Sequence, residues 1–142
     1  MLVSTEQMVF RMTLPSTQKN IGRVEKFLLK IAQHVELDEI QLHKAMVSVT
    51  EAVNNAIVHG NRCNPKRKVF VICEVLPGWL LFIVSDQGKG FKPEKVANPL
   101  KEENLLRESG RGIFLMRTLM DRVEFELQKT GYQVRLWLDL KK

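Results

Sequence analysis

Residues 68–85 carry the sequence KVFVICEVLPGWLLFIVS, which decides the fold class. Both halves are rich in β-branched and other apolar residues, and the dipeptide Pro77–Gly78 separates them. Apolar runs on either side of a turn signal predict a β-hairpin with strands at 68–76 and 79–85. The chain is therefore expected to build on an antiparallel pair of strands.

One strand and two helices are expected before this hairpin. Residues 8–14 alternate between apolar and other side chains, which predicts a strand that ends at the following proline. Ser16 is expected to cap a helix whose apolar residues recur every three or four positions. Asp38 and Gln41 have the spacing of a capping box and open a second amphipathic helix, which should end at Gly60.

Another helix and two more strands are expected after it. Residues 88–109 are polar and contain prolines, which predicts a long loop. A helix should begin at Gly110, and alternating strands at 123–127 and 134–140 should turn at Thr130–Gly131. The order β-α-α-β-β-loop-α-β-β predicts a two-layer α/β (α+β) sandwich with an antiparallel or mixed sheet and helices on one face.

Composition limits the class of protein. The chain has 142 residues, so at roughly 150 residues per domain we expect a single domain over 1–142. Hydrophobic residues make up 44% and charged residues 27%, which excludes a disordered or low-complexity chain. The longest apolar run, residues 79–84, is too short to span a membrane.

Charge and cysteine content bear on the expected partners and cellular location. The formal net charge is +6, and the densest basic cluster has no interleaved aromatic residues. A solvated loop is therefore favoured over a nucleic-acid interface, and neither a membrane nor a nucleic-acid partner is expected. Two lone cysteines without metal-ligand spacing, and an N-terminus without a signal-peptide pattern, favour a reduced cytoplasmic location. The basic cluster consists of Arg62, Lys66, Arg67 and Lys68.

The second helix carries a polar stripe beside its apolar stripe. Glu51, Asn55 and His59 lie four residues apart, so they share one face. A carboxylate can act as a general base, and a carboxamide oxygen suits Mg²⁺. An exposed polar face is the more common explanation of such spacing, and His59 could equally be an ordinary helix-end histidine.

Two glycine-rich segments offer further chemistry. Residues 86–91, DQGKGF, follow an apolar strand; an aspartate there can accept a hydrogen bond from an exocyclic amine, and the glycines allow close approach of a ring. Residues 109–116, SGRGIFLM, open a helix whose free N–H groups can bind an anion. Taken singly, each could be only a turn or a loop-to-helix junction. No P-loop and no dinucleotide fingerprint is present.

Together and in this order, the three segments resemble the ATP-binding motifs of the gyrase/Hsp90/histidine-kinase/MutL (GHKL) superfamily. EAVNNAIVHG at 51–60 resembles the N box, and segments 86–91 and 109–116 resemble the first and second glycine boxes. The resemblance runs from about Leu14 to the C-terminus and is greatest to bacterial anti-sigma-factor serine kinases. It implies a Bergerat-type ATP-binding fold with a mixed, mostly antiparallel sheet.

The resemblance also implies roles for individual residues. Glu51 would be the general base, Asn55 the Mg²⁺ ligand and Asp86 the adenine contact. Residues 92–109 would form a lid over ATP. The other expected nucleotide contacts are Gly88, Gly90, Ser109, Gly110, Arg111 and Gly112.

The function implied is that of an ATP-dependent serine/threonine kinase that phosphorylates an anti-sigma antagonist, sequesters a sigma factor and forms a homodimer. Relatives often place an arginine directly before the second glycine box, where this chain has Glu108. A nucleotide-binding regulatory module without phosphoryl transfer is therefore the alternative. A detached histidine-kinase ATPase domain is a third possibility, and the carboxylate four residues before Asn55 counts against it.

Overall fold

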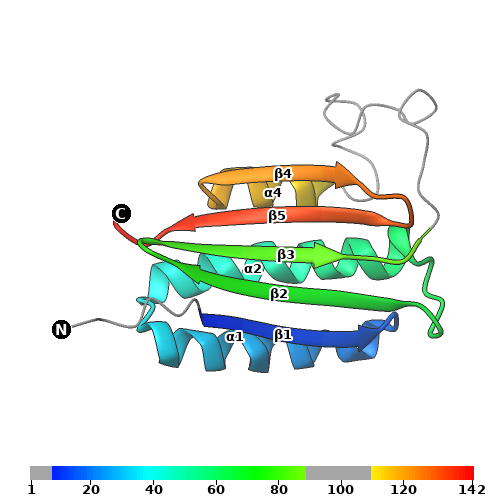
Figure 1. Cartoon of the computed structure of the whole chain (residues 1–142), viewed down its shortest axis with the longest axis horizontal. Coiled ribbons are helices and arrows are strands. Elements are labelled where there is room, and N and C mark those ends of the chain that lie inside the picture. Colours follow the sequence, from blue (N-terminus) through cyan, green and yellow to red (C-terminus); the bar gives the residue numbers. More distant parts are fainter. Residues whose placement is uncertain (1–7, 89–109) are drawn as a thin grey trace.

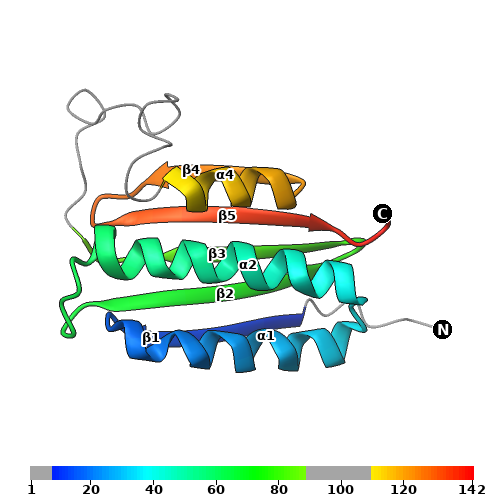
Figure 2. The same cartoon turned by 180° about the vertical axis from the view of Figure 1, so that it is seen from behind.

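A computed structural model describes residues 8–88 and 110–142 and shows five strands in one sheet with every helix on one side of it (Figures 1 and 2). The strand order is β1-β2-β3-β5-β4, and each of the four pairings is antiparallel. The strands are β1 (Met8–Pro15), β2 (Lys68–Leu76), β3 (Trp79–Ser85), β4 (Arg122–Leu127) and β5 (Tyr132–Asp139). The helices are η1 (Gln18–Asn20), α1 (Ile21–Val35), α2 (Glu39–Asn55), η2 (Ala56–Gly60) and α4 (Gly110–Leu119).

The predicted two-layer sandwich is thus confirmed, and within the described residues the sheet is antiparallel rather than mixed. The β2–β3 hairpin turns at Pro77–Gly78, where Gly78 has a φ of 75°. That left-handed conformation suits glycine because it has no Cβ to clash. The turn predicted from Pro77–Gly78 thus joins β2 and β3 as an antiparallel pair.

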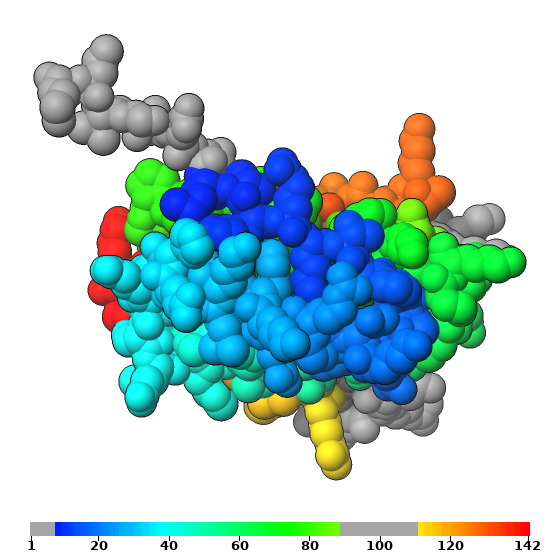
Figure 3. Space-filling model, turned by 90° about the horizontal axis from the view of Figure 1, so that it is seen from below, coloured from blue at the N-terminus to red at the C-terminus, as the bar shows by residue number. Residues whose placement is uncertain are grey.

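The core lies between the sheet and the helices. α2 crosses the middle of the sheet and packs against α1 on one side and α4 on the other (Figure 2). Viewed from below, α1 covers the edge of the molecule beside β1 (Figure 3). The largest fully buried side chains come from both layers and include Phe82, Leu14, Leu28, Ile31, Ile57, Leu80, Met116, Leu136 and Leu138.

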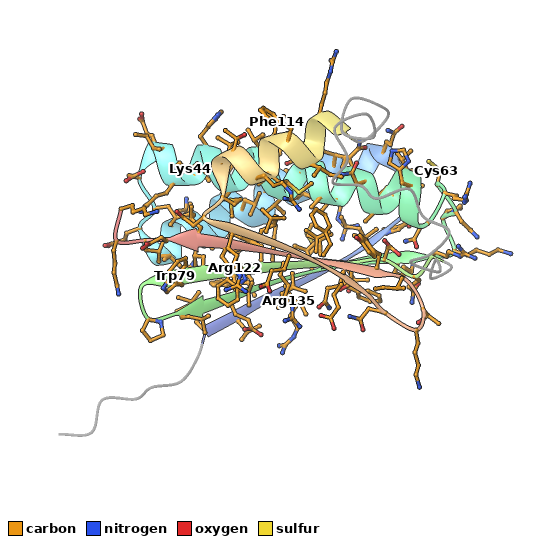
Figure 4. The ribbon with its side chains drawn as sticks, turned by 90° about the horizontal axis from the view of Figure 1, so that it is seen from above. Lys44, Cys63, Trp79, Phe114, Arg122 and Arg135 are labelled. Atoms are coloured by element: carbon orange, nitrogen blue, oxygen red, sulfur yellow. The ribbon has the colours of Figure 1, made fainter. Side chains whose placement is uncertain are left out.

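No helix that the structure describes covers the other face of the sheet. Figure 4 shows the two layers edge-on, with Trp79, Arg122 and Arg135 on the side of the sheet away from the helices. There the rings of Trp79 and Trp137 meet edge-to-face at 6.2 Å, and the Trp137 Nε1–H donates to Glu124 at 2.8 Å. None of the helices in residues 8–88 and 110–142 is long and apolar enough to cross a membrane.

The beginnings of the two long helices differ. α2 has the predicted capping box: Gln41 N–H donates to Asp38 Oδ1 at 2.7 Å, and Asp38 N–H donates to Gln41 Oε1 at 3.0 Å. The prediction that Ser16 caps α1 is wrong, because η1 intervenes and Asn20 occupies the N-cap position without a side-chain cap. The Ser16 hydroxyl donates instead to the Arg67 carbonyl at 2.7 Å, so a tertiary contact replaces the local one.

Candidate functional site

The end of α2 changes its winding where the site begins. Residues Ala56–Gly60 form the π-helical turn η2, and Asn61 N–H donates back to the Ala56 carbonyl at 2.8 Å. Single π turns inside helices are frequent at functional sites, because they widen the backbone and redirect the residues that follow. Here the widened turn brings Gly60 against Asp86.

Asp86 follows β3 directly and faces the start of β5. Its N–H donates to the Tyr132 carbonyl at 3.0 Å, which extends the β3–β5 ladder by one step. Its Oδ1 accepts from Gly88 N–H at 3.0 Å and from Tyr132 N–H at 3.1 Å. Oδ2 accepts no hydrogen bond from the described residues and is not among their fully buried, unpartnered atoms. The carboxylate is therefore held by one oxygen, and the other remains available as an acceptor.

Three glycines enclose this carboxylate. A Cβ built on Gly60 would lie 2.1 Å from Asp86 Oδ2, and one on Gly131 would lie 2.0 Å from the Asp86 carbonyl oxygen. A Cβ on Gly88 would lie 2.0 Å from the Gly60 carbonyl oxygen. Any larger residue at these positions would displace backbone or the carboxylate itself. The glycines thus allow three backbone segments to converge on Asp86.

Burial is the main influence on the ionisation of Asp86, which is 8% exposed. Desolvation raises the pKa of this carboxyl above its usual value, and the N–H groups of Gly88 and Tyr132 and the charge of Arg67 offset only part of that rise. The pKa of Tyr132 is also raised, first by burial and then by the charge of Asp86. A buried acceptor with a raised pKa is typical of a ligand-binding position.

A second cluster forms where α2 meets the beginning of α4. A Cβ on Gly112 would lie 2.7 Å from Glu51 Oε2 and 3.5 Å from Asn55 Nδ2, so both side chains reach the first turn of α4. Gly112 itself is buried, whereas Arg111 is exposed. The structure thus brings the carboxylate and carboxamide of one helix to the N-terminal N–H groups of another.

The predicted site residues divide into three groups. Glu51 and Asn55 meet Gly112 at the α2–α4 contact, and Gly110 and Arg111 precede Gly112 in the first turn of α4. Asp86 and Gly88 form a separate cluster after β3. Asn54 accepts instead from Gln18 Nε2 at 3.3 Å, and His59 is exposed on η2. Gly90, Ser109 and the expected lid at 92–109 lie outside the described residues.

Sequence reasoning missed several residues that build the Asp86 cluster. Gly60 and Gly131 were noticed only as a helix end and a turn, although a glycine at an element boundary can also signal a close approach. Asn61 and Tyr132 carried no local signal, because their role depends on contacts with residues far away in the sequence. Asp86 and Tyr132, for example, are 46 positions apart.

An antiparallel two-layer sandwich with Glu51 and Asn55 at one end of α2 is the arrangement expected of a GHKL-type ATPase domain. The sequence model of the family described as "Histidine kinase-like ATPase domain" matches residues 14–138. The chain belongs to this family.

Two relatives with similar sequences are serine-protein kinases. The chain is 27% identical over 128 residues to the serine-protein kinase RsbW of Staphylococcus epidermidis, an alignment that covers 85% of this chain and 80% of that protein. It is 26% identical over 138 residues to the serine-protein kinase RsbW of Staphylococcus aureus (strain JH9), with 92% of this chain and 86% of that protein covered.

Solved structures share the fold. The RsbU and RsbW domains of a Mycobacterium tuberculosis protein match with a TM-score of 0.68 and 17% identity over 93% of this chain and 32% of that one. A blue-light-activated histidine kinase domain from Erythrobacter litoralis matches with a TM-score of 0.57 and 17% identity over 89% and 62%. The chain thus spans about a third of the first of these structures and less than two thirds of the second.

Proposed function

We propose that this chain is an ATP-dependent serine/threonine protein kinase of the anti-sigma type, formed as a single domain. It would phosphorylate an antagonist protein, sequester a sigma factor and work as a homodimer in the cytoplasm. The similarity to proteins named serine-protein kinase RsbW supports this role. The observation that carries the kinase assignment is the meeting of Glu51 and Asn55 at Gly112.

Asp86 supplies the base-recognition part of the proposal. Among the described residues no group donates to its Oδ2, while its Oδ1 is held by two backbone N–H groups. An exocyclic amine of adenine is the donor that fits this acceptor. The surrounding glycines leave room for a flat ring to approach the backbone.

Asn55 and the beginning of α4 supply the phosphate part. The carboxamide oxygen of Asn55 is a hard ligand that suits Mg²⁺, which when bound neutralises charge on the phosphates. The N–H groups of Gly110, Arg111 and Gly112 lie at the positive end of the α4 dipole. Gly90 of the first glycine box and Ser109 of the second, which lie outside the described residues, complete the proposed contacts by sequence.

Glu51 supplies the proton acceptor. It lies one helical turn before Asn55, is partly buried, and its Oε2 faces the first turn of α4. A carboxylate in this position can accept the proton of a serine or threonine hydroxyl as that oxygen attacks phosphorus. Phosphoryl transfer depends mainly on positioning and charge stabilisation, so few residues are needed.

The test is phosphate transfer from radiolabelled ATP to a candidate antagonist protein. Glu51→Gln keeps the shape of the side chain but removes the proton acceptor, so transfer should fall by roughly 10²–10⁴-fold. ATP affinity should stay within a few-fold. Glu25→Gln, which changes an exposed glutamate of α1, is the matched control and should transfer like the wild type.

The two proteins should be compared at equal nucleotide occupancy. Equal transfer by wild type and Glu51→Gln would show that Glu51 is not the base. Binding of ATP without transfer by either protein would favour the regulatory-module alternative. In that event Glu108, at the position where relatives often have arginine, is the first residue to replace.

A further inference from the structure

Asn61 is fully buried although it is polar and follows η2 directly. Its Nδ2 donates to Ser16 Oγ at 2.7 Å and to the Lys68 carbonyl at 2.9 Å. Its Oδ1 accepts from Gln87 N–H at 2.7 Å. A single side chain therefore joins the end of β1, the start of β2 and the segment after β3.

These contacts fix which way the Asn61 amide faces. The Lys68 carbonyl can only accept and the Gln87 N–H can only donate, so an exchange of the amide oxygen and nitrogen would place two donors and two acceptors against each other. Gln87 is held a second time, because its Oε1 accepts from Lys68 N–H at 2.7 Å. Asn61 is buried and its amide oxygen and nitrogen are both paired, whereas Gln87 is exposed, so the buried amide sets the orientation of the network.

Gln87 lies between Asp86 and Gly88, and the Gly88 N–H donates to the Asp86 carboxylate. Asp86 presents Oδ1 to Gly88 N–H, so the direction of Oδ2 depends on the backbone from 86 to 88. Asn61 holds the peptide N–H in the middle of that turn. Asn61 is not placed to contact a ligand itself, because it is fully buried and its amide oxygen and nitrogen both have partners within the protein.

We propose that Asn61 is a positioning residue for adenine selectivity: it holds the 86–88 turn so that Asp86 presents its free oxygen to the exocyclic amine. This inference rests on the proposed function, since it deepens the role given there to Asp86. Without the Asn61–Gln87 hydrogen bond, the 86–88 turn gains freedom and the Gly88 N–H holds Oδ1 less firmly. The Tyr132 N–H remains, so the direction of the carboxylate is loosened. Contacts made to the phosphates at α4 are unaffected.

The test compares two nucleotides by calorimetry with Mg²⁺ present. ATP carries the exocyclic amine, and purine riboside triphosphate lacks it but has the same sugar and phosphates. Asn61→Ala should weaken ATP by about 10-fold and purine riboside triphosphate by less than about 3-fold, so the preference for ATP collapses. A loss of folded protein alone would weaken both nucleotides equally.

Two further variants separate positioning from folding. Ser16→Ala removes a different partner of Asn61 and the hydrogen bond to Arg67, but leaves the Gln87 contact. It should lower the unfolding temperature and keep the preference for ATP. Asn61→Asp keeps an acceptor for Gln87 N–H and, in its folded fraction, should also keep the preference. If Asn61→Ala does not fold, Asn61→Ser replaces it, because its oxygen is one bond too short to reach Gln87.

The outcomes are distinguishable. A wild type that binds both nucleotides equally would overturn the adenine role of Asp86 and thus the proposed site. A wild type that prefers ATP, together with an Asn61→Ala or Asn61→Ser variant that keeps this preference, would overturn only the positioning role of Asn61. Loss of the preference in Ser16→Ala would also overturn it, since general loosening would then explain the effect.

Discussion

Asp86 is the one charged side chain among the buried residues of the described part of the chain. Its raised pKa, caused first by burial, means that the folded state disfavours the charged form. A residue kept in this condition lowers stability at neutral pH, as groups at binding sites often do. The same burial strengthens a hydrogen bond to a ligand, because water competes less.

Asp86→Asn should therefore stabilise the nucleotide-free protein at pH 7 by about 0.5–2 kcal/mol. The pKa of the carboxyl is higher in the folded than in the unfolded state, so protonation on acidification removes the cost. The gain should be full at neutral pH and disappear as the pH falls below the usual aspartate range. Urea unfolding across pH 3–7 measures it.

Asp121 provides the opposite sign as a control. Burial acts to raise its pKa, but the N–H of Asp139 and the ammonium of Lys142 outweigh this and lower it. Asp121→Asn should thus lose stability at neutral pH, and the loss should fade on acidification through the folded-state pKa. Equal pH profiles for the two variants would contradict this account of Asp86.

Gly60 makes a second prediction at the residue scale. A Cβ there would meet Asp86 Oδ2 at 2.1 Å, so Gly60→Ala should displace the carboxylate and weaken ATP by at least about 10-fold. Gly22→Ala is the matched control, since a Cβ at that exposed position of α1 meets nothing within 4 Å. It should stabilise the protein by about 0.5–1 kcal/mol and leave binding unchanged. Calorimetry measures ATP binding by the two variants, and urea unfolding measures their stability. Normal ATP binding by Gly60→Ala would count against the proposed site.

At the scale of elements, α2 serves the core and the site with different faces. Its capping box lies at the end remote from η2, so the two can be tested separately. Asp38→Ala should cost about 1 kcal/mol of unfolding free energy, and Asp38→Ser should recover most of it. ATP affinity should stay the same. A large change in ATP affinity would show that the two ends of α2 are coupled, so that the cap affects the site as well as stability.

Elements with strong local signals were predictable from sequence. The 68–76 and 79–85 strands and the Asp38–Gln41 cap agree with the structure because neighbouring residues determine them. Ser16 was assigned wrongly, since nothing local reveals that its hydroxyl bonds to Arg67, 51 positions away. The π-helical winding of η2 also has no periodic signature in the sequence.

At the scale of the whole molecule, the site depends on segments that only the folded sheet brings together. The sequence pattern predicted Glu51 and Asn55 on the second helix and Asp86 directly after a strand, and the structure has them there. The convergence of Gly60, Gly88 and Gly131 on one carboxylate comes from strand register and could not be read along the chain. The roles of all these residues in binding and catalysis stay predictions.

The most direct test of the account is calorimetric titration of the wild type and Asp86→Ala with ATP in the presence of Mg²⁺. Removing a buried, charge-assisted hydrogen bond should weaken ATP binding by roughly 1.5–3 kcal/mol, or about 10- to 150-fold. Near-ultraviolet circular dichroism confirms that both proteins are folded. Equal affinity in the two proteins, or no binding by the wild type, would contradict the claim that Asp86 recognises adenine in this chain.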